Sequence, residues 1–169
     1  MKIKTPIKKF LLLSAGLLFA VSHLACTKVL VHGRDKDYDP AERSFSASTE
    51  ATYKAGKEAL IRLGYKIETE DDKTGTMVTN WASTKATSHY IDLFDHRDYG
   101  TVGAYYRMKL AVAESVGGKT RVEVSAPTRS IITGRLRTSY REENKVLRKI
   151  ADLLRTDDFE MTNVGVTEK

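Results

Sequence analysis

The stretch TEATYKAGKEALIRLGYKIETEDDKTGTMVTNW, residues 49–81, predicts a helix followed by a β-hairpin. Its first half has an amphipathic face with spacings of three and four, formed by Tyr53, Gly56, Leu60 and Leu63. Glu50 falls in the first turn and Gly64 just past the last, where an acid and a glycine suit the two ends of a helix. We therefore predict a helix over residues 49–63.

The second half of this stretch predicts a β-hairpin. Residues 65–69, YKIET, alternate in character, and residues 76–83, TMVTNWAS, are rich in β-branched and aromatic side chains. The segment between them, EDDKTG at 70–75, has the composition of a turn. Two antiparallel strands should therefore follow the helix directly.

The flanking sequence supplies the remaining elements. Residues 43–48 can form a first strand, and residues 101–115 and 119–127 form a longer hairpin around the turn Val116-Gly117-Gly118. A second helix is expected over residues 138–155, with its inward stripe made of Tyr140, Glu143, Leu147, Ile150 and Leu154. The order β-α-β-β-β-β-α predicts an α+β fold: a two-layer antiparallel sheet of four to five strands with both helices packed on one face.

The N-terminus has the layout of a bacterial secretory signal peptide. Several lysines precede an apolar run of about a dozen residues, which is too short for a membrane-spanning helix of roughly 20. The run ends in LAC, where Cys26 is the only cysteine of the chain. This ending resembles the lipobox of bacterial lipoproteins, although His23 stands where that box has leucine. The resemblance implies cleavage after residue 25, a diacylglycerol on the Cys26 thiol and an acyl chain such as palmitate on its amine. Ordinary signal cleavage with a free Cys26 is the alternative.

Cleavage would divide the chain into four parts. Residues 1–25 would be the signal peptide, 26–42 a charged tether, 43–158 the α+β domain and 159–169 a tail. Without the four lysines of residues 1–25 the formal net charge falls from +6 to +2. A nucleic-acid partner normally requires a clustered basic excess, so we do not expect one.

Residues 44–155 resemble the domain of the BamC family, a lipoprotein of the machinery that assembles outer-membrane β-barrels. The resemblance lies in a helix ending in LGY, an acidic turn with glycine, and an aromatic in the next strand, at Leu63, Gly64, Tyr65, Asp71, Asp72, Gly75 and Trp81. It implies a helix-grip fold, with each of these residues in a structural role. BamC has two such domains and a long partner-docking segment, whereas this chain has one domain and a short tether.

Two segments carry candidate binding residues. Residues 88–100 gather charges and aromatics, with Tyr90 and Phe94 as candidate partner contacts; the weaker alternative is a metal site made of His89, Asp92, Asp95 and His96. Residues 129–141 contain four arginines suited to carboxylate or phosphate, namely Arg129, Arg135, Arg137 and Arg141. No cofactor is expected.

These features favour a non-catalytic binding or assembly-accessory lipoprotein of the cell envelope. The sequence has neither Gly-x-Ser-x-Gly nor His-Glu-x-x-His, so we expect no enzyme. A periplasmic carrier of a lipid or small apolar ligand is the main alternative, and a hydrolase using His89 and His96 is a further one. Thr27 after the cysteine favours the outer over the inner membrane, with an envelope protein as partner.

Overall fold

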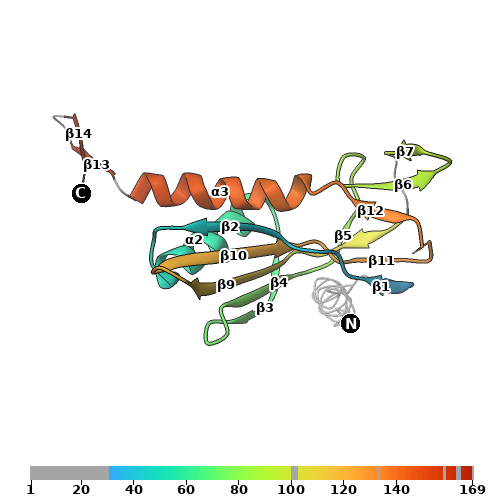
Figure 1. Ribbon diagram of the computed structural model, residues 1–169, viewed down its shortest axis with the longest axis horizontal. Helices are drawn as coiled ribbons and strands as arrows, with labels where there is room; N and C mark the ends of the chain where they lie inside the picture. Colours follow the sequence, from blue (N-terminus) through green and yellow to red (C-terminus); the bar gives the residue numbers. More distant parts are fainter. Residues whose placement is uncertain (1–30, 100–102, 133, 158, 163–164, 169) are drawn as a thin grey trace, which may run out of the picture. The chain divides into compact units, whose positions relative to one another are not determined.

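Antiparallel sheets and two helices build the described part of the chain (Figure 1). The computed structural model describes residues 31–99, 103–132, 134–157, 159–162 and 165–168. The expected signal peptide, Cys26, Thr27 and Gly100 lie outside these residues. The elements are β1 (Arg34–Lys36), β2 (Ala41–Phe45), α2 (Thr49–Arg62), β3 (Ile67–Asp71), β4 (Thr76–Thr79), β5 (Ala82–Ser83), β6 (His89–Leu93), β7 (His96–Asp98), β8 (Tyr105–Tyr106), β9 (Lys109–Ser115), β10 (Lys119–Ser125), β11 (Thr128–Ser130), β12 (Leu136–Thr138), α3 (Arg141–Asp157), β13 (Phe159–Thr162) and β14 (Gly165–Glu168).

The main sheet consists of two sections with the same strand order. One section has the order β2-β10-β9-β4-β3 and the other has the order β1-β11-β8-β5. Each strand of the four-stranded section is next in sequence to the strand at the same place in the five-stranded section: β1 to β2, β11 to β10, β8 to β9 and β5 to β4. Backbone bonds connect the sections, because Thr79 donates to the Met108 carbonyl at 2.9 Å and Arg107 donates to the Pro127 carbonyl at 3.1 Å. Pro40 and Pro127 lie at the breaks, and proline has no N–H to continue a ladder.

Local signals set the ends of α2. The Ser48 hydroxyl accepts a hydrogen bond from the Ala51 N–H at 3.2 Å, which caps the first turn. Gly64 follows the last turn with a φ of +84°, a conformation that glycine adopts without steric cost. The helix expected over residues 49–63 is thus confirmed as Thr49–Arg62.

Both helices pack on the five-stranded section, α2 against β9 and α3 against β10 and β2. Gly56 permits a close approach, since a Cβ there would lie 3.3 Å from the Leu110 Cδ1 and 3.9 Å from the Ile150 Cδ1. Side chains fill the space between the layers, among them Leu60, Tyr106, Met108, Leu110, Val122, Val124, Val146 and Ile150.

The predicted α+β class, with antiparallel strands and two helices, is confirmed, but one sheet was too simple a prediction. A further sheet, β12-β6-β7, lies beside the four-stranded section, where the buried His89 ring lies 5.2 Å from the Tyr106 ring. Residues 136–138 pair with β6, so the second helix begins at Arg141 rather than at residue 138. Residues 88–100, expected as a loop, contain the β6–β7 hairpin.

The expected tether and tail also contain strands. Arg34–Lys36 pairs with β11, and β2 begins at Ala41, so the described sheet begins within the residues 26–42 assigned to the tether. Strand β1 is short and polar, which explains why its pairing left no apolar alternation in the sequence. In the tail, β13 and β14 form an antiparallel hairpin.

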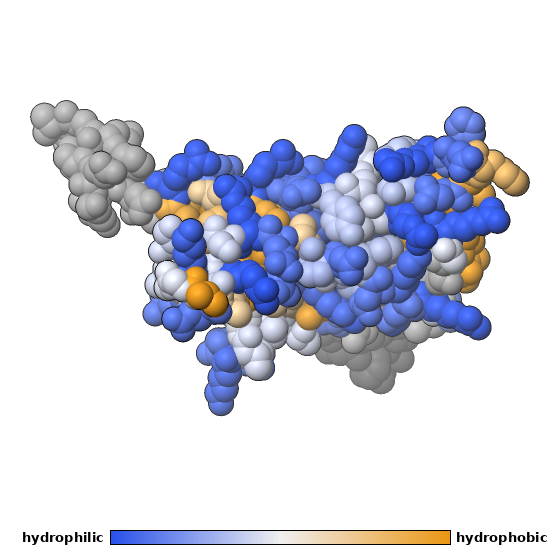
Figure 2. All heavy atoms as spheres, viewed as in Figure 1, coloured by the Kyte–Doolittle hydropathy of each residue, from blue (hydrophilic) through white to orange (hydrophobic). Residues whose placement is uncertain are grey.

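Most of the visible surface is hydrophilic, and one of its apolar areas lies at the end that carries β6, β7 and β12 (Figure 2). Large apolar or aromatic side chains are exposed at Ile61, Phe94, Tyr99, Val116, Ile131, Ile132 and Tyr140.

Candidate functional site

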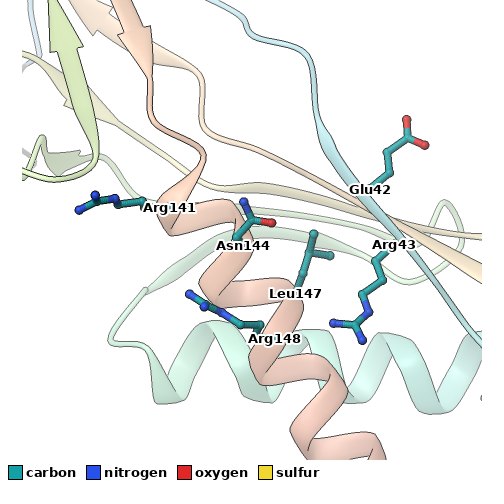
Figure 3. Close-up of a pocket in the computed structure, with 6 residues that line it drawn as sticks. All are labelled: Glu42, Arg43, Arg141, Asn144, Leu147 and Arg148. Atoms are coloured by element: carbon teal, nitrogen blue, oxygen red, sulfur yellow. The ribbon is translucent and has the colours of Figure 1, made fainter. Parts of the chain in front are cut away.

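A surface groove lined by three arginines lies between the N-terminal half of α3 and strand β2 (Figure 3). Its volume is about 360 Å³, and we call it the arginine groove; it is lined by Glu42, Arg43, Arg141, Asn144, Leu147 and Arg148. Arg141 and Arg148 are seven residues apart, two turns of the helix, and therefore lie on the same side of α3. Arg43 comes from β2, where its guanidinium carbon lies 5.4 Å from the centre of the Phe45 ring.

The groove has an excess of positive charge. Three arginines and one glutamate give its lining a formal charge of +2. Within the described residues no ion pair joins Arg43, Arg141 or Arg148 to an acid, whereas the carboxylate of Glu42 lies 3.9 Å from the Arg121 guanidinium. Guanidinium groups offer several donors in a plane and bind carboxylates and phosphates in pairs of bonds. The groove is therefore suited to an anionic ligand.

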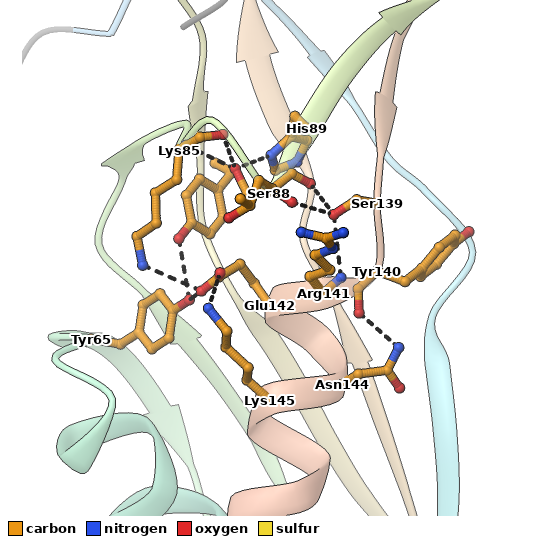
Figure 4. A network of polar contacts seen from close by, with 12 residues as sticks. Tyr65, Lys85, Ser88, His89, Ser139, Tyr140, Arg141, Glu142, Asn144 and Lys145 are labelled. Atoms are coloured by element: carbon orange, nitrogen blue, oxygen red, sulfur yellow. Dashed lines mark hydrogen bonds and ion pairs between the residues drawn. The ribbon is translucent and has the colours of Figure 1, made fainter. Parts of the chain in front are cut away.

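Hydrogen bonds from the neighbouring hairpin hold the start of α3 in place (Figure 4). The Ser139 hydroxyl donates to the carbonyl oxygens of Thr87 at 2.7 Å and Ser88 at 2.9 Å. Asn144 donates from both its backbone and its side chain to the Tyr140 carbonyl, at 3.0 and 2.7 Å. These contacts fix the direction in which the first turn of α3 leaves the sheet, and hence the positions of the groove residues.

Glu142 attaches the same turn to the core. Its carboxylate is almost fully buried and accepts hydrogen bonds from the Tyr65 hydroxyl at 2.8 Å, Lys145 at 2.7 Å and Lys85 at 3.3 Å. Burial alone would raise the pKa of Glu142, but the bonds from Lys145 and Tyr65 and the charge of Lys85 outweigh it and lower the pKa. A carboxylate with three donors is well satisfied, which suits a structural role.

Two neighbouring groups are buried with a polar atom that has no hydrogen-bond partner within the described residues. Glu143 accepts from the Thr138 hydroxyl at 2.7 Å through Oε1, but its Oε2 has no partner, and burial raises its pKa. The Nδ1 of His89 lies 2.9 Å from the Ser88 hydroxyl, while its Nε2 has no well-aligned partner. Burial lowers the pKa of His89 to about 4, against weaker opposing effects of the Ala126 carbonyl and the Glu142 charge.

The predicted contact residues fall into three separate places. Tyr90 and Arg137 lie directly opposite each other in the β6–β12 pair, and the Arg137 Nε is 3.7 Å from an Asp92 carboxylate oxygen. The Arg135 carbonyl accepts from the Asp92 N–H at 3.2 Å, and Phe94 occupies the exposed turn between β6 and β7. Folding thus brings parts of the two predicted segments, residues 89–98 and 136–138, together in one small sheet.

Arg129 and Arg141 lie elsewhere. Arg129 forms a two-bond ion pair with Asp35, with one of the bonds at 2.8 Å, and its guanidinium lies 4.6 Å from the centre of the Trp81 ring. Arg107 also stacks on Trp81, at 4.7 Å, so this half-buried aromatic, expected in a structural role, is a platform for two cations. Arg141 alone of the four predicted arginines lines the arginine groove.

The four residues of the alternative metal site do not converge. His89 is buried in β6 beside Tyr106, whereas His96 is exposed in β7. Asp92 faces Arg137, and Asp95 lies in the turn with a φ of +63°. Among the described residues there is no group of three or more His, Cys, Asp or Glu side chains that could hold a metal ion.

Three residues that line the groove, Arg43, Asn144 and Arg148, were not predicted from the sequence as candidate contacts. The seven-residue spacing of Arg141 and Arg148 in a predicted helix was a signal that could have paired them. Arg43 has no such signal, because its position depends on how β2 lies beside α3.

No family model and no curated protein matches the chain. Among solved structures it is similar to a crystal structure of Ara h 8.0201, with 13% identity over 72% of this chain and 99% of that one, at a TM-score of 0.37. A likeness this distant carries no conclusion about fold or function. Within the described residues, no helix is long and apolar enough to cross a bilayer.

Proposed function

We propose that this protein is a lipid-anchored binding module of the bacterial cell envelope whose arginine groove binds an acidic segment of a partner protein. The observation that carries the proposal is the set of three arginines, Arg43, Arg141 and Arg148, that line one groove and form no ion pair with an acid within the described residues. An acidic segment would supply the carboxylates that these groups lack.

A protein partner fits the groove because its lining combines charge with apolar and amide groups. Leu147 offers an apolar contact, and Asn144 can exchange hydrogen bonds with a peptide backbone. The rigid attachment of α3 through Glu142 and Ser139 favours such recognition, since little order would have to be gained on binding. We propose a non-catalytic role because the buried Glu142 is held by three donors rather than exposed to a substrate.

A carrier of apolar ligands receives less support. Such a protein needs an apolar cavity between the sheet and the helices, and Gly56, Leu110 and Ile150 are in close contact there. This packing favours surface recognition over ligand storage.

The anchor and the domain family are parts of the same proposal. The signal-like N-terminus and the LAC motif support a lipid on Cys26, and Thr27 supports the outer membrane. The order β-α-β-β-β-β-α within the five-stranded section supports a helix-grip, BamC-like domain. On this basis the partner would be a component of the envelope, and a role in outer-membrane protein assembly is one instance.

The groove is tested with a fluorescent hexaglutamate peptide, with hexalysine as the opposite-charge probe. We expect the triple variant Arg43→Gln, Arg141→Gln, Arg148→Gln to bind hexaglutamate roughly tenfold more weakly, since exposed ion pairs contribute roughly 0.2–1 kcal/mol each. The control variant Lys54→Gln, Arg62→Gln, Lys73→Gln removes the same charge away from the groove. Equal losses in the two variants would show that only net charge matters and would refute a specific groove.

The anchor is tested by mass spectrometry of the mature N-terminal peptide from membranes. We expect a peptide that begins at Cys26 and carries the mass of attached acyl chains. The variant Cys26→Ser should leave the membrane fraction. An unmodified Cys26 in a membrane-bound chain would overturn the lipid anchor.

A further inference from the structure

Three exposed apolar side chains, Phe94, Ile131 and Ile132, lie at one end of the sheets, and we call this set the apolar tip. Phe94 is 90% exposed and Ile131 is 81% exposed, so these side chains gain little from packing within the domain. Apolar surface gathers at this end in Figure 2. Single exposed apolar residues are common, but several at one place indicate a contact with another surface.

Strand register shows why these residues share one end. Leu136 pairs with Ile91 and the Asp92 N–H binds the Arg135 carbonyl, so the chain before β12 runs alongside the β6–β7 turn. Strand β11 ends at Ser130, immediately before the two isoleucines. The turn that carries Phe94 and the segment after β11 therefore project in the same direction (Figure 1).

The backbone at Phe94 is unfavourable for phenylalanine. Leu93 pairs with His96, which leaves a two-residue turn in which Phe94 and Asp95 have φ values of +46° and +63°. Turns of this kind favour asparagine and glycine, because other side chains crowd the backbone at positive φ. A residue that neither suits its turn nor packs inside the domain does not serve folding, which favours a role in contact with another surface.

The described chain begins beside the same tip. Arg34 pairs with Ser130 in antiparallel register, and Gly33 approaches so closely that a Cβ there would lie 2.4 Å from the Ser130 carbonyl carbon. Val31 therefore starts next to the segment that carries Ile131 and Ile132. Cys26 precedes Val31 by five residues, a length of chain that spans at most roughly 18 Å.

We propose that the apolar tip inserts into the lipid surface to which Cys26 is anchored. This inference rests on the lipid anchor of the proposed function. A lipid on Cys26 would hold this end of the domain within roughly 18 Å of the bilayer, where exposed apolar side chains can enter the interface between headgroups and acyl chains. Arg34 and Arg135 lie at the same end, where arginines suit anionic headgroups.

The experiment uses the lipidated full-length chain in vesicles of phosphatidylethanolamine and phosphatidylglycerol. Cys26 is the only cysteine, so a second one introduced by Phe94→Cys or Ile131→Cys is the only free thiol once Cys26 carries lipid. A nitroxide label on that thiol reports its exposure to oxygen dissolved in the lipid and to a nickel chelate in the water. The matched control is Val116→Cys, an apolar position that is 97% exposed in the β9–β10 turn, at the far end of the sheet in Figure 1.

We expect the ratio of oxygen to nickel accessibility at positions 94 and 131 to exceed that at position 116 several-fold. Replacing Phe94 and Ile132 by serine should return a label at position 131 to the aqueous value, with an unchanged circular dichroism spectrum. Equal ratios at all three positions would overturn the proposal. So would tip labels that are shielded from both oxygen and nickel, which would indicate a second copy or another protein on the tip. The mass of the Cys26 peptide from the same sample separates a missing anchor from a tip that does not insert.

Discussion

Acidification should destabilise the fold through His89 before it affects the buried glutamates. The imidazole is fully buried, with its ring 5.2 Å from the Tyr106 ring and 6.3 Å from the Tyr38 ring. Its Nδ1 meets the Ser88 hydroxyl at 2.9 Å. Desolvation penalises the charged form, so the pKa falls from 6.5 to about 4.

The sign and size of the effect follow from linkage. Because the pKa of His89 is lowered, the unfolded chain binds the proton more readily, and this contribution to stability is present above pH 6.5 and is lost as the pH falls toward 4. One pKa unit corresponds to about 1.4 kcal/mol, so the whole contribution is about 3 kcal/mol. Most of it should disappear between pH 6.5 and 4.5.

The two glutamates next to this region act in other ways. The pKa of Glu142 is lowered, so its contribution is lost only as the pH falls below 4.5. The pKa of Glu143 is raised, so protonation relieves the folded state and acts against the loss from His89. The fall in stability between pH 6.5 and 4.5 therefore belongs to His89.

Urea unfolding followed by circular dichroism across this pH range measures the effect, with His89→Asn as the comparison. Asparagine can keep a hydrogen bond to Ser88 but does not titrate, so its stability should change little where the parent loses about 2 kcal/mol. A variant that loses as much stability as the parent would show that His89 does not cause the loss. A nuclear magnetic resonance titration in which the His89 imidazole takes up its proton above pH 6 would show the same.

Two further substitutions test the attachment of α3 and the β3–β4 turn. Glu142→Ala removes the acceptor of the buried Tyr65 hydroxyl and of two lysine bonds, and should lower the free energy of unfolding by about 2–4 kcal/mol in urea titrations. Glu142→Gln should have a smaller effect. An unchanged unfolding midpoint in Glu142→Ala would contradict this hydrogen-bond network. Gly75→Ala places a Cβ 2.2 Å from the Val112 carbonyl oxygen at a φ of +67°, and should lower the free energy of unfolding by more than about 2 kcal/mol. Gly64→Ala has open space around the added Cβ and should lower it by only about 1 kcal/mol. Equal decreases of the melting temperature in the two variants would contradict the contact at Gly75.

The sequence predicted those parts of the fold whose signals are local. Ser48 at the cap, Gly64 at the end of α2 and the acidic turn before Gly75 each act within a few residues, and the first helix and hairpin formed as expected. The turn Val116-Gly117-Gly118 likewise fixed the β9–β10 hairpin, which pairs from Ser115 and Lys119 outward. Elements of this kind need no knowledge of distant partners.

Elements that depend on distant partners were not predicted. Strand β12 has three residues and pairs with β6, whose opposite residue, His89, lies 49 positions before Thr138. Strand β1 is polar and finds its partner in β11, 94 positions away at the Asp35 and Arg129 pair. Neither strand has an alternating apolar pattern long enough to be recognised, and each gains its hydrogen bonds only after the main sheet has formed.

The candidate site shows the same dependence on long-range pairing. Arg129 and Arg141 are equivalent in the sequence, since both belong to the basic segment 129–141. In the fold Arg129 forms an ion pair with Asp35 and lies against the Trp81 ring, so its charge is already satisfied, whereas Arg141 lines the groove and has no ion pair with an acid among the residues that the structure describes. An arginine is available to a ligand only when the fold places no carboxylate beside it. The carboxylate that occupies an arginine can come from an acid distant in sequence, as Asp35 does for Arg129. Composition can therefore indicate that a segment is basic, but only the packing of β2 against α3 decides that Arg43 and Arg148 join Arg141 in the arginine groove.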